Sequence, residues 1–194
     1  MNDFYEQNHR QYFESTVGID PSAFLEPLAV RLKPGAAILD VGCGSGRDLR
    51  WFVDRGFRPT GFEKSPALAG LARRHSGCPV IRGDFLRFDF SRLRFDALVI
   101  VGALVHVPRD SLAAVLQSIC RVLAPGGLAL VTLKEGSGSF RSSDGRVFTL
   151  WSAGELEGIF ASIPLQVLDF SRSPSEVRPD DAWLGFVLRR PDAS

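Results

Sequence analysis

The chain has 194 residues, of which 45% are hydrophobic and 23% charged, so it is long enough for one domain with a substantial core and has an ordinary globular balance. Its 23 basic and 22 acidic residues give a formal net charge of +1, which argues against a nucleic-acid partner. The three cysteines lack metal-ligand spacing, the N-terminus lacks the apolar stretch of a signal peptide, and no apolar run approaches the ~20 residues of a membrane span. We therefore expect a cytoplasmic protein, monomeric or homodimeric, with no metal site and no membrane partner.

Short apolar runs alternate with amphipathic segments through the first two thirds of the chain. Strands are predicted at 36–41, 58–63, 78–83, 95–104 and 127–134, and helices at 47–56, 65–75 and 110–127. Ser65 as N-cap and Pro66 at the first helical position support the second of these helices. The apolar face of the first helix is expected to hold Leu49, Phe52 and Val53.

The C-terminal third is predicted to hold one helix and two strands. Ser152 and Glu155 form a capping box at the start of the helix 152–163. The strands 165–171 and 183–190 follow with no helical pattern between them, so we expect them to pair antiparallel. The order of elements predicts an α/β fold, a doubly wound, Rossmann-like, seven-stranded sheet that is mostly parallel with one antiparallel C-terminal strand, in a single domain over residues 1–194. In such a sheet a ligand binds beyond the carboxyl ends of the strands.

The stretch "ILDVGCGSGRD", residues 38–48, places an acid and three glycines just after the first predicted strand. A glycine loop between a strand and a helix lets a ligand approach the backbone and the free N–H groups of the helix. A P-loop would require GxxxxGK followed by Ser or Thr, which the sequence lacks. A dinucleotide fingerprint would require GxGxxG or GxGxxA, whereas Gly46 comes one place early and Arg47 stands at the required position. The spacing weakens an NAD-dependent oxidoreductase without excluding it, and S-adenosylmethionine is a third possible ligand.

The glycine loop resembles the first motif of the class I S-adenosylmethionine-dependent methyltransferases. Four further segments resemble later motifs of that family in the expected order: "GFEKSP", "RGDFL", "FDALVIVGALVHVP" and "RVLAPGGLALVTLKEG". With "GSGRD", "LVHVP", "KEG" and "DGRVFTLW", the chain is similar to the small bacterial methyltransferases described as tellurite-resistance-like, which act mostly on small molecules. Many of these relatives have Asp where this chain has Glu63, a change that keeps the carboxylate. The resemblance implies S-adenosyl-L-methionine as the cofactor.

The resemblance also implies which residues bind this cofactor. They are Tyr12, Asp40, Gly42, Gly44, Glu63, Lys64, Asp84, Phe85 and Gly102. Asp40 would organise the loop and approach the methionine amino group, while Glu63 would accept hydrogen bonds from the ribose hydroxyls. Asp84 would accept a hydrogen from the adenine amino group, and Phe85 would donate its backbone N–H to the ring.

The remaining cofactor residues have roles set by space. Side chains at Gly42 and Gly44 would collide with the cofactor or with the turn. Lys64 would pack beside the adenosine, and Gly102 would leave room for the transferring methyl. Tyr12 belongs to residues 1–18, which by the resemblance fold over the cofactor as a lid. The alternative for this segment is an amphipathic N-terminal helix that only packs on the domain.

His106, in "LVHVP", is the candidate catalytic residue, since a histidine near neutrality can take a proton from a nucleophile. The alternative, that its ring braces the loop through a backbone carbonyl, is slightly favoured. The segment 136–146 is the most linker-like in the chain, and the loop 137–150 is expected to close the substrate side, with Phe148 and Trp151 at the mouth. Arg141 and Arg146 are weak candidates for contact with an anionic substrate.

The sequence therefore predicts methyl transfer from S-adenosylmethionine to a small-molecule acceptor by in-line displacement. The accepting atom, N, O, S or Se, stays open, and aromatic acceptors are included. The segment after the fourth strand reads "GALV" instead of DPPY or NPPY, which disfavours the amino-methylating DNA and glutamine enzymes. A module that binds S-adenosylmethionine without turnover is the second alternative beside the oxidoreductase.

Overall fold

The computed structural model of the protein describes residues 4–174 and 181–192. Within these ranges seven strands form one sheet in the order β3-β2-β1-β4-β5-β9-β8. Their bounds are β1 Ala37–Val41, β2 Arg58–Glu63, β3 Val80–Arg82, β4 Phe95–Val101, β5 Leu123–Lys134, β8 Gln166–Pro174 and β9 Ala182–Arg189. The pairs among β1 to β5 are parallel, and β9 pairs antiparallel with both β5 and β8. The predicted mostly parallel sheet with one antiparallel strand is confirmed.

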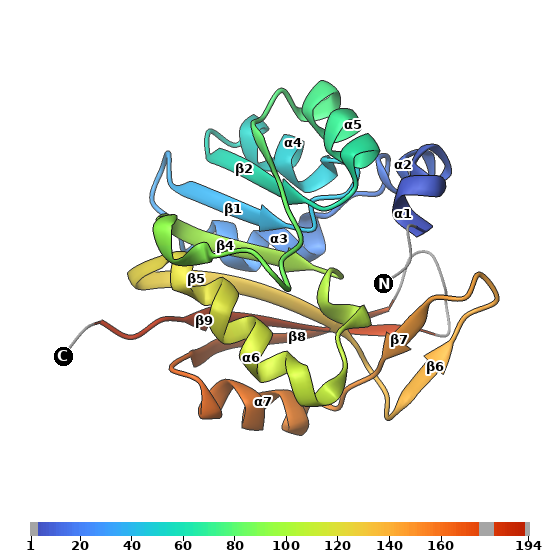
Figure 1. The fold of residues 1–194 in the computed structure, drawn as a ribbon. Coiled ribbons are helices and arrows are strands. Elements are labelled where there is room, and N and C mark those ends of the chain that lie inside the picture. The colour runs from blue at the N-terminus through green and yellow to red at the C-terminus, as the bar shows by residue number, and fades with distance from the viewer. Residues whose placement is uncertain (1–3, 175–180, 193–194) are drawn as a thin grey trace.

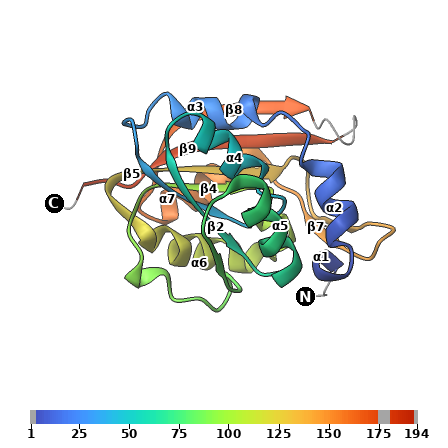
Figure 2. The same cartoon turned by 90° about the horizontal axis from the view of Figure 1, so that it is seen from above.

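Helices cover both faces of this sheet. One face carries α3 Ser22–Ala29, α4 Arg47–Asp54 and α5 Pro66–Ser76, and the other carries α6 Arg109–Ile119 and α7 Ala153–Ser162. In Figure 1, α4 and α5 lie above the sheet and α6 and α7 below it. The view from above in Figure 2 shows α3 on the side opposite α6. This layering leaves the carboxyl ends of the parallel strands open to a ligand.

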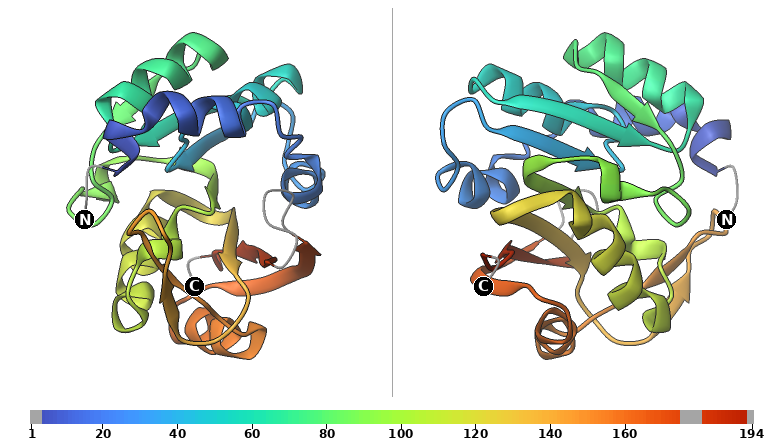
Figure 3. Two further views of the ribbon diagram at one scale, coloured as in Figure 1. Left: turned by 90° about the vertical axis from the view of Figure 1, so that its right-hand side faces the viewer. Right: turned by 60° about the vertical axis from the view of Figure 1, so that its left-hand side comes forward.

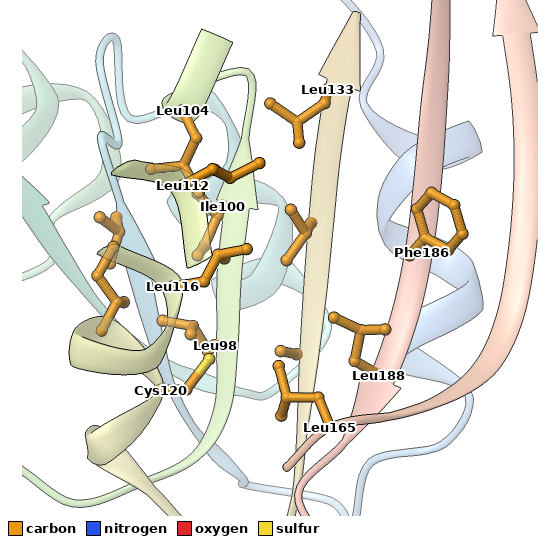
Figure 4. Packing of buried hydrophobic residues seen from close by; sticks show 14 of the residues in the cluster. Leu98, Ile100, Leu104, Leu112, Leu116, Cys120, Leu133, Leu165, Phe186 and Leu188 are labelled. Carbon is orange, nitrogen blue, oxygen red and sulfur yellow. The ribbon is translucent and has the colours of Figure 1, made fainter. Parts of the chain in front are cut away.

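The central strand β4 shows why both faces need cover. Successive side chains of a strand point to opposite faces, so Leu98 and Ile100 join one core cluster while Ala97 and Val99 join the other. Leu98 and Ile100 lie close to Leu112 and Leu116 of α6 in Figure 4. The continuous apolar run that predicted this strand is the consequence of its burial on both sides.

Short-range capping signals are also confirmed. The Ser65 hydroxyl accepts the N–H of Leu68 at 3.1 Å at the start of α5. Ser152 and Glu155 form the reciprocal capping box of α7. Both interactions join residues three positions apart, so the local sequence is enough to specify them.

Two details of the predicted helices are wrong. The helix predicted at 110–127 ends at Ile119, a 3₁₀ turn follows over Cys120–Val122, and β5 begins at Leu123. Pro125 has no N–H for a helix, and Gly126 has a φ of +73°, which a helix does not tolerate. Val53, expected on the apolar face of α4, is 36% exposed.

The segment 136–146 is part of a β-hairpin and not a linker. β6 Ser139–Arg141 pairs antiparallel with β7 Val147–Thr149. The turn between them uses Asp144, whose carboxylate accepts the N–H of Arg146 at 3.1 Å, and Gly145, whose φ is +83°. Asp-Gly is a common hairpin turn signal. Only three residues pair on each side of this turn, so the flanking strands are too short to give a clear alternating pattern in the sequence.

The N-terminal segment forms two short helices, α1 Phe4–Gln7 and α2 His9–Thr16. They lie at the same end of the molecule as the β6–β7 hairpin in Figures 1 and 3. In the part of the chain that the structure describes, no helix is both long and apolar enough to cross a membrane. Nor do three or more His, Cys, Asp or Glu side chains gather as a metal site among residues 4–174 and 181–192.

Candidate active site

The glycine loop follows β1 and is tightly packed on both sides. A Cβ atom added to Gly42 would lie 2.6 Å from the Cβ of Ala103, and one added to Gly44 would lie 3.0 Å from the ring of Tyr12. A Cβ atom on Gly46 would lie 2.8 Å from the Cα of Ala72 in α5. Gly46 therefore allows close packing of α4 and α5. Gly42 and Gly44 likewise allow Ala103 and Tyr12 to lie against the loop backbone.

Asp40, near the end of β1, carries a buried carboxyl group with an unsatisfied hydrogen-bond acceptor. Its Oδ2 atom has no hydrogen-bond partner among the described residues. Burial raises the pKa of Asp40, and the nearby charge of Asp48 raises it further. A buried carboxylate without a partner is costly, and a cationic ligand group would offset that cost. Asp40 therefore fits a site for a ligand's ammonium group.

Glu63, at the end of β2, joins the glycine loop to the start of α5. Its carboxylate accepts the backbone N–H groups of Gly44 at 3.1 Å and Ser65 at 2.8 Å. Burial raises the pKa of Glu63, and these backbone hydrogen bonds partly counteract the shift. The carboxylate is only 7% exposed, so it is not a solvated acid at a strand end.

Lys64 and Asp84 lie beside this carboxylate and form an ion pair with a distance of 2.9 Å between Nζ and Oδ2. Partial burial alone would raise the pKa of Asp84, but hydrogen bonds from Lys64 and from the N–H of Leu86 outweigh burial and lower it. The ring of Phe85 packs against the core, which leaves its main chain as the group for ligand contact. The predicted adenine-side residues are thus close together after β2 and β3.

His106 lies in the short 3₁₀ turn Leu104–His106 after β4. Its Nδ1 lies 2.6 Å from the carbonyl oxygen of Val147, and its Nε2 lies 2.8 Å from the hydroxyl of Tyr5. The brace to a backbone carbonyl is therefore present, and the second ring nitrogen is hydrogen-bonded to Tyr5. Burial lowers the pKa of His106, which favours the neutral ring. Gly102, four residues earlier, has a φ of +64°, and a Cβ there would meet Trp183 at 3.3 Å.

The N-terminal helices pack directly on these groups. Tyr12 is half-buried against Gly44, and the loss of solvent around its hydroxyl raises its pKa. Glu6 accepts hydrogen bonds from the hydroxyl of Ser65 and from the N–H of Ala67 at the first turn of α5. The acid next to Tyr5 in the chain therefore ties α1 to the same turn that Glu63 contacts.

A cavity of about 410 Å³ lies between these elements. Its lining comes from α1, the end of β2, the start of α5, the turn after β4 and the β6–β7 hairpin: Phe4, Tyr5, Glu6, Glu63, Lys64, Ser65, Pro66, His106, Arg141, Asp144, Gly145, Arg146 and Val147. A second cavity of about 500 Å³ lies between the C-terminal ends of α6 and α7 and contains none of the predicted site residues. The first cavity is therefore the candidate active site.

Sequence reasoning missed part of this cavity and misplaced two aromatic residues. Phe148 and Trp151 are buried in the core at 5% and 3% exposure and do not line the mouth. No motif in the sequence singles out Tyr5 or Glu6 of the N-terminal segment. A Tyr–Glu pair in a polar N-terminal segment is a weak signal. The residues that these side chains contact in the fold, His106 and Ser65, lie far away in the sequence.

Comparisons with known proteins identify methyltransferases of similar sequence and fold. Residues 38–127 match the family model described as "Methyltransferase domain". A sterol 24-C-methyltransferase of Gibberella zeae is 37% identical over 107 residues, which cover 51% of this chain and 28% of that relative. The chain thus spans less than a third of that relative's length.

Two solved structures share the fold. The 1,6-didemethyltoxoflavin-N1-methyltransferase of Burkholderia thailandensis, with bound 1,6-didemethyltoxoflavin and S-adenosylhomocysteine, has a TM-score of 0.77 at 22% identity, covering 97% of this chain and 84% of that chain. A TehB-like S-adenosylmethionine-dependent methyltransferase of Corynebacterium glutamicum has a TM-score of 0.71 at 22% identity, covering 99% of this chain and 100% of that chain. At this identity the likenesses establish the fold.

Proposed function

Because the chain belongs to the class I S-adenosylmethionine-dependent methyltransferases, we propose that it transfers a methyl group from S-adenosylmethionine to a small-molecule acceptor. The observation that carries the proposal is that Glu63, which accepts the N–H of Gly44 in the glycine loop, and His106 line one cavity of about 410 Å³. Its lining combines charged groups with the aromatic rings of Phe4 and Tyr5, which suits a small polar or aromatic acceptor.

The methionine end of the cofactor would lie along the glycine loop. Asp40 supplies a buried oxygen without a partner, which suits the ammonium group. The lack of side chains at Gly42 and Gly44 lets Ala103 and Tyr12 lie against the loop beside which the cofactor would bind. Gly102 keeps the end of β4 free of a side chain where the methyl group would lie.

The adenosine end would lie beyond β2 and β3. Glu63 accepts hydrogen bonds from two backbone N–H groups and keeps further acceptor capacity for ribose hydroxyls. Lys64 and Asp84 flank the adenine position as an ion pair, and Phe85 offers its main chain. These residues line or adjoin the cavity from one side, whereas His106 lines it from the other.

S-adenosylmethionine supplies, when bound, a methyl group on a sulfonium, which is a good leaving group. The protein's task is then to hold the acceptor in line and to exclude water, for which positioning can contribute about 7–11 kcal/mol. α1 and the β6–β7 hairpin both line the cavity, and the hydrogen bond from Arg146 to Tyr5 joins them, which supports a role in excluding water. His106 faces the acceptor side and is proposed as the catalytic group.

Calorimetry with S-adenosylmethionine, S-adenosylhomocysteine and NAD tests the cofactor. We expect micromolar-range binding of the first two and none of NAD, since Gly46 packs on α5 and Arg47 occupies the third dinucleotide position. Incubation with methyl-labelled S-adenosylmethionine and a panel of thiols, amines and phenols then tests turnover. Binding of NAD alone would end the proposal, and cofactor binding with no labelled product across the panel would favour a module without turnover.

A further inference from the structure

Tyr5, His106 and Val147 form one hydrogen-bonded chain along the wall of the cavity. The carbonyl oxygen of Val147 can only accept, so the Nδ1 atom of His106, 2.6 Å away, carries a proton. In a neutral imidazole the other nitrogen is then an acceptor, and Nε2 receives the hydroxyl proton of Tyr5 at 2.8 Å. The geometry therefore assigns both the tautomer of His106 and the direction of the bond from Tyr5.

The Tyr5 oxygen also accepts a hydrogen bond. Nη1 of Arg146 lies 3.3 Å from it and donates to it. Arg146 is held in place by Asp144, with Nη2 to Oδ2 at 2.7 Å, and its guanidinium carbon lies 4.3 Å from the ring centroid of Phe4. A fixed cation beside a phenol oxygen stabilises any negative charge that develops on that oxygen.

Tyr5 is positioned by contacts on both sides. Its ring meets that of Tyr12 edge-on with a centroid distance of 5.1 Å. Glu6 is bonded to the hydroxyl of Ser65 and the N–H of Ala67, so α1 cannot shift without breaking these bonds. Tyr5 thus lines the same cavity as the cofactor-side residue Glu63.

We propose that Tyr5 is a second catalytic residue, that Tyr5 and His106 form a proton relay, and that the methyl acceptor is a weakly acidic hydroxyl compound such as a phenol or an enol. The inference rests on the proposed methyl transfer. A thiol has a pKa of about 8.5 and is a strong nucleophile once ionised, and a free amine already has its lone pair, so neither depends on a two-group base as much as a phenol with a pKa of about 10 does. The structure places such a base on the cavity wall and fixes its tautomer.

The proton and the electron pairs balance as follows. The acceptor oxygen bonds to the methyl carbon as the sulfur–carbon bond breaks, and that electron pair stays on sulfur. The acceptor's hydroxyl proton moves to the Tyr5 oxygen while the Tyr5 proton moves to Nε2 of His106. The imidazolium keeps its Nδ1–H on Val147 and returns the Nε2 proton to solvent through Tyr5 when the product leaves.

The charged groups around the relay suit a neutral resting state. Arg146 and Asp144 face His106 from the hairpin, and Glu63 faces Tyr5 from β2. Burial lowers the pKa of His106 and raises the pKa of Tyr5, so both are neutral near pH 7 and His106 is free to accept a proton.

Two probes of similar shape test the relay, phenol and thiophenol, each with S-adenosylmethionine at about pH 8, where thiophenol is largely ionised and phenol, with a pKa of about 10, is protonated. Tyr5→Phe removes the hydroxyl, and His106→Asn keeps a donor for Val147 but removes Nε2. We expect both variants to lower the rate on the phenol about 100- to 10,000-fold and to leave the rate on the thiol nearly unchanged. His75→Asn, in the last turn of α5 and outside the cavity, is the matched control and should leave both rates unchanged.

Nitrogen NMR of the imidazole gives a readout that needs no turnover. His106 should show a proton on Nδ1 and none on Nε2, and Tyr5→Phe should raise its pKa because the donor that stabilises the neutral ring is lost. A proton on Nε2 overturns the relay, as does methylation of the thiol alone, or a Tyr5→Phe variant that methylates the phenol at the wild-type rate. If S-adenosylhomocysteine binds but neither probe is methylated, the position of the proton on His106 supports the relay when it is on Nδ1 and overturns the relay when it is on Nε2. If neither cofactor nor product binds, the proposed function itself has failed.

Discussion

Replacing Glu63 with alanine is the sharpest test of the cofactor side of the cavity. The carboxylate accepts the N–H groups of Gly44 and Ser65 at 3.1 Å and 2.8 Å. Hydrogen bonds to a charged group contribute about 1.5–3 kcal/mol each, so the pair sets an upper limit of about 3–6 kcal/mol on the loss of stability. Burial raises the pKa of Glu63, so the carboxylate is itself costly to bury and its removal offsets part of this loss. We expect the free energy of unfolding, measured with urea, to fall by about 2–4 kcal/mol.

The same substitution should weaken binding of S-adenosylhomocysteine. A ribose hydroxyl left without its acceptor costs about 1–3 kcal/mol, which raises the dissociation constant roughly 5- to 150-fold. Calorimetry on the folded variant measures this constant. Glu157→Ala, on an exposed position of α7, is the matched control and should change neither quantity. An unchanged dissociation constant together with lost stability would refute the ribose role and leave Glu63 only as the support of the glycine loop.

Three further predictions concern the glycine loop, the buried aspartate and the N-terminal segment. Gly46→Ala should lower the free energy of unfolding, measured with urea, by about 1–3 kcal/mol more than Gly77→Ala does. The two glycines have similar φ angles, +79° and +74°, but only at Gly46 would a Cβ meet the backbone of Ala72. Equal losses of stability would contradict this reasoning. Asp40→Asn should stabilise the ligand-free protein while weakening product binding. Because burial raises the pKa of Asp40 in the folded state, the wild-type protein loses stability as the pH rises above the ordinary aspartate pKa of about 4, so the stability gained by the substitution should widen with rising pH; a gain that narrows would argue against a buried charge. Deleting residues 1–13 should leave the circular dichroism spectrum unchanged but impair methyl transfer more than product binding. In the full chain, hydrogen exchange should show that bound product protects the β6–β7 hairpin. Normal turnover by the deletion variant would leave α1 and α2 as packing elements only.

Part of this architecture is visible in short stretches of sequence. The strand before Asp40, the glycines after it, and the caps Ser65 and Ser152 each depend on neighbours within a few positions, so local periodicity and spacing predict them. The order of strands and helices then predicts the sheet, because right-handed crossovers leave few topologies open. The candidate cofactor residues are implied by the family resemblance of the five motifs, and most of them lie at or just after the carboxyl ends of predicted strands.

The acceptor side was decided by tertiary structure alone. Tyr5 and His106 are 101 positions apart, and Arg146 is 141 positions from Tyr5, so no sequence pattern connects them. Phe148 reads as a residue for the cavity mouth, yet it stacks on Phe140 and packs against His106 inside the core. Its burial depends on the hairpin docking at the strand ends, which is a long-range contact. Local propensities specify each element, whereas the chemistry between elements arises only when the sheet brings their ends to one edge.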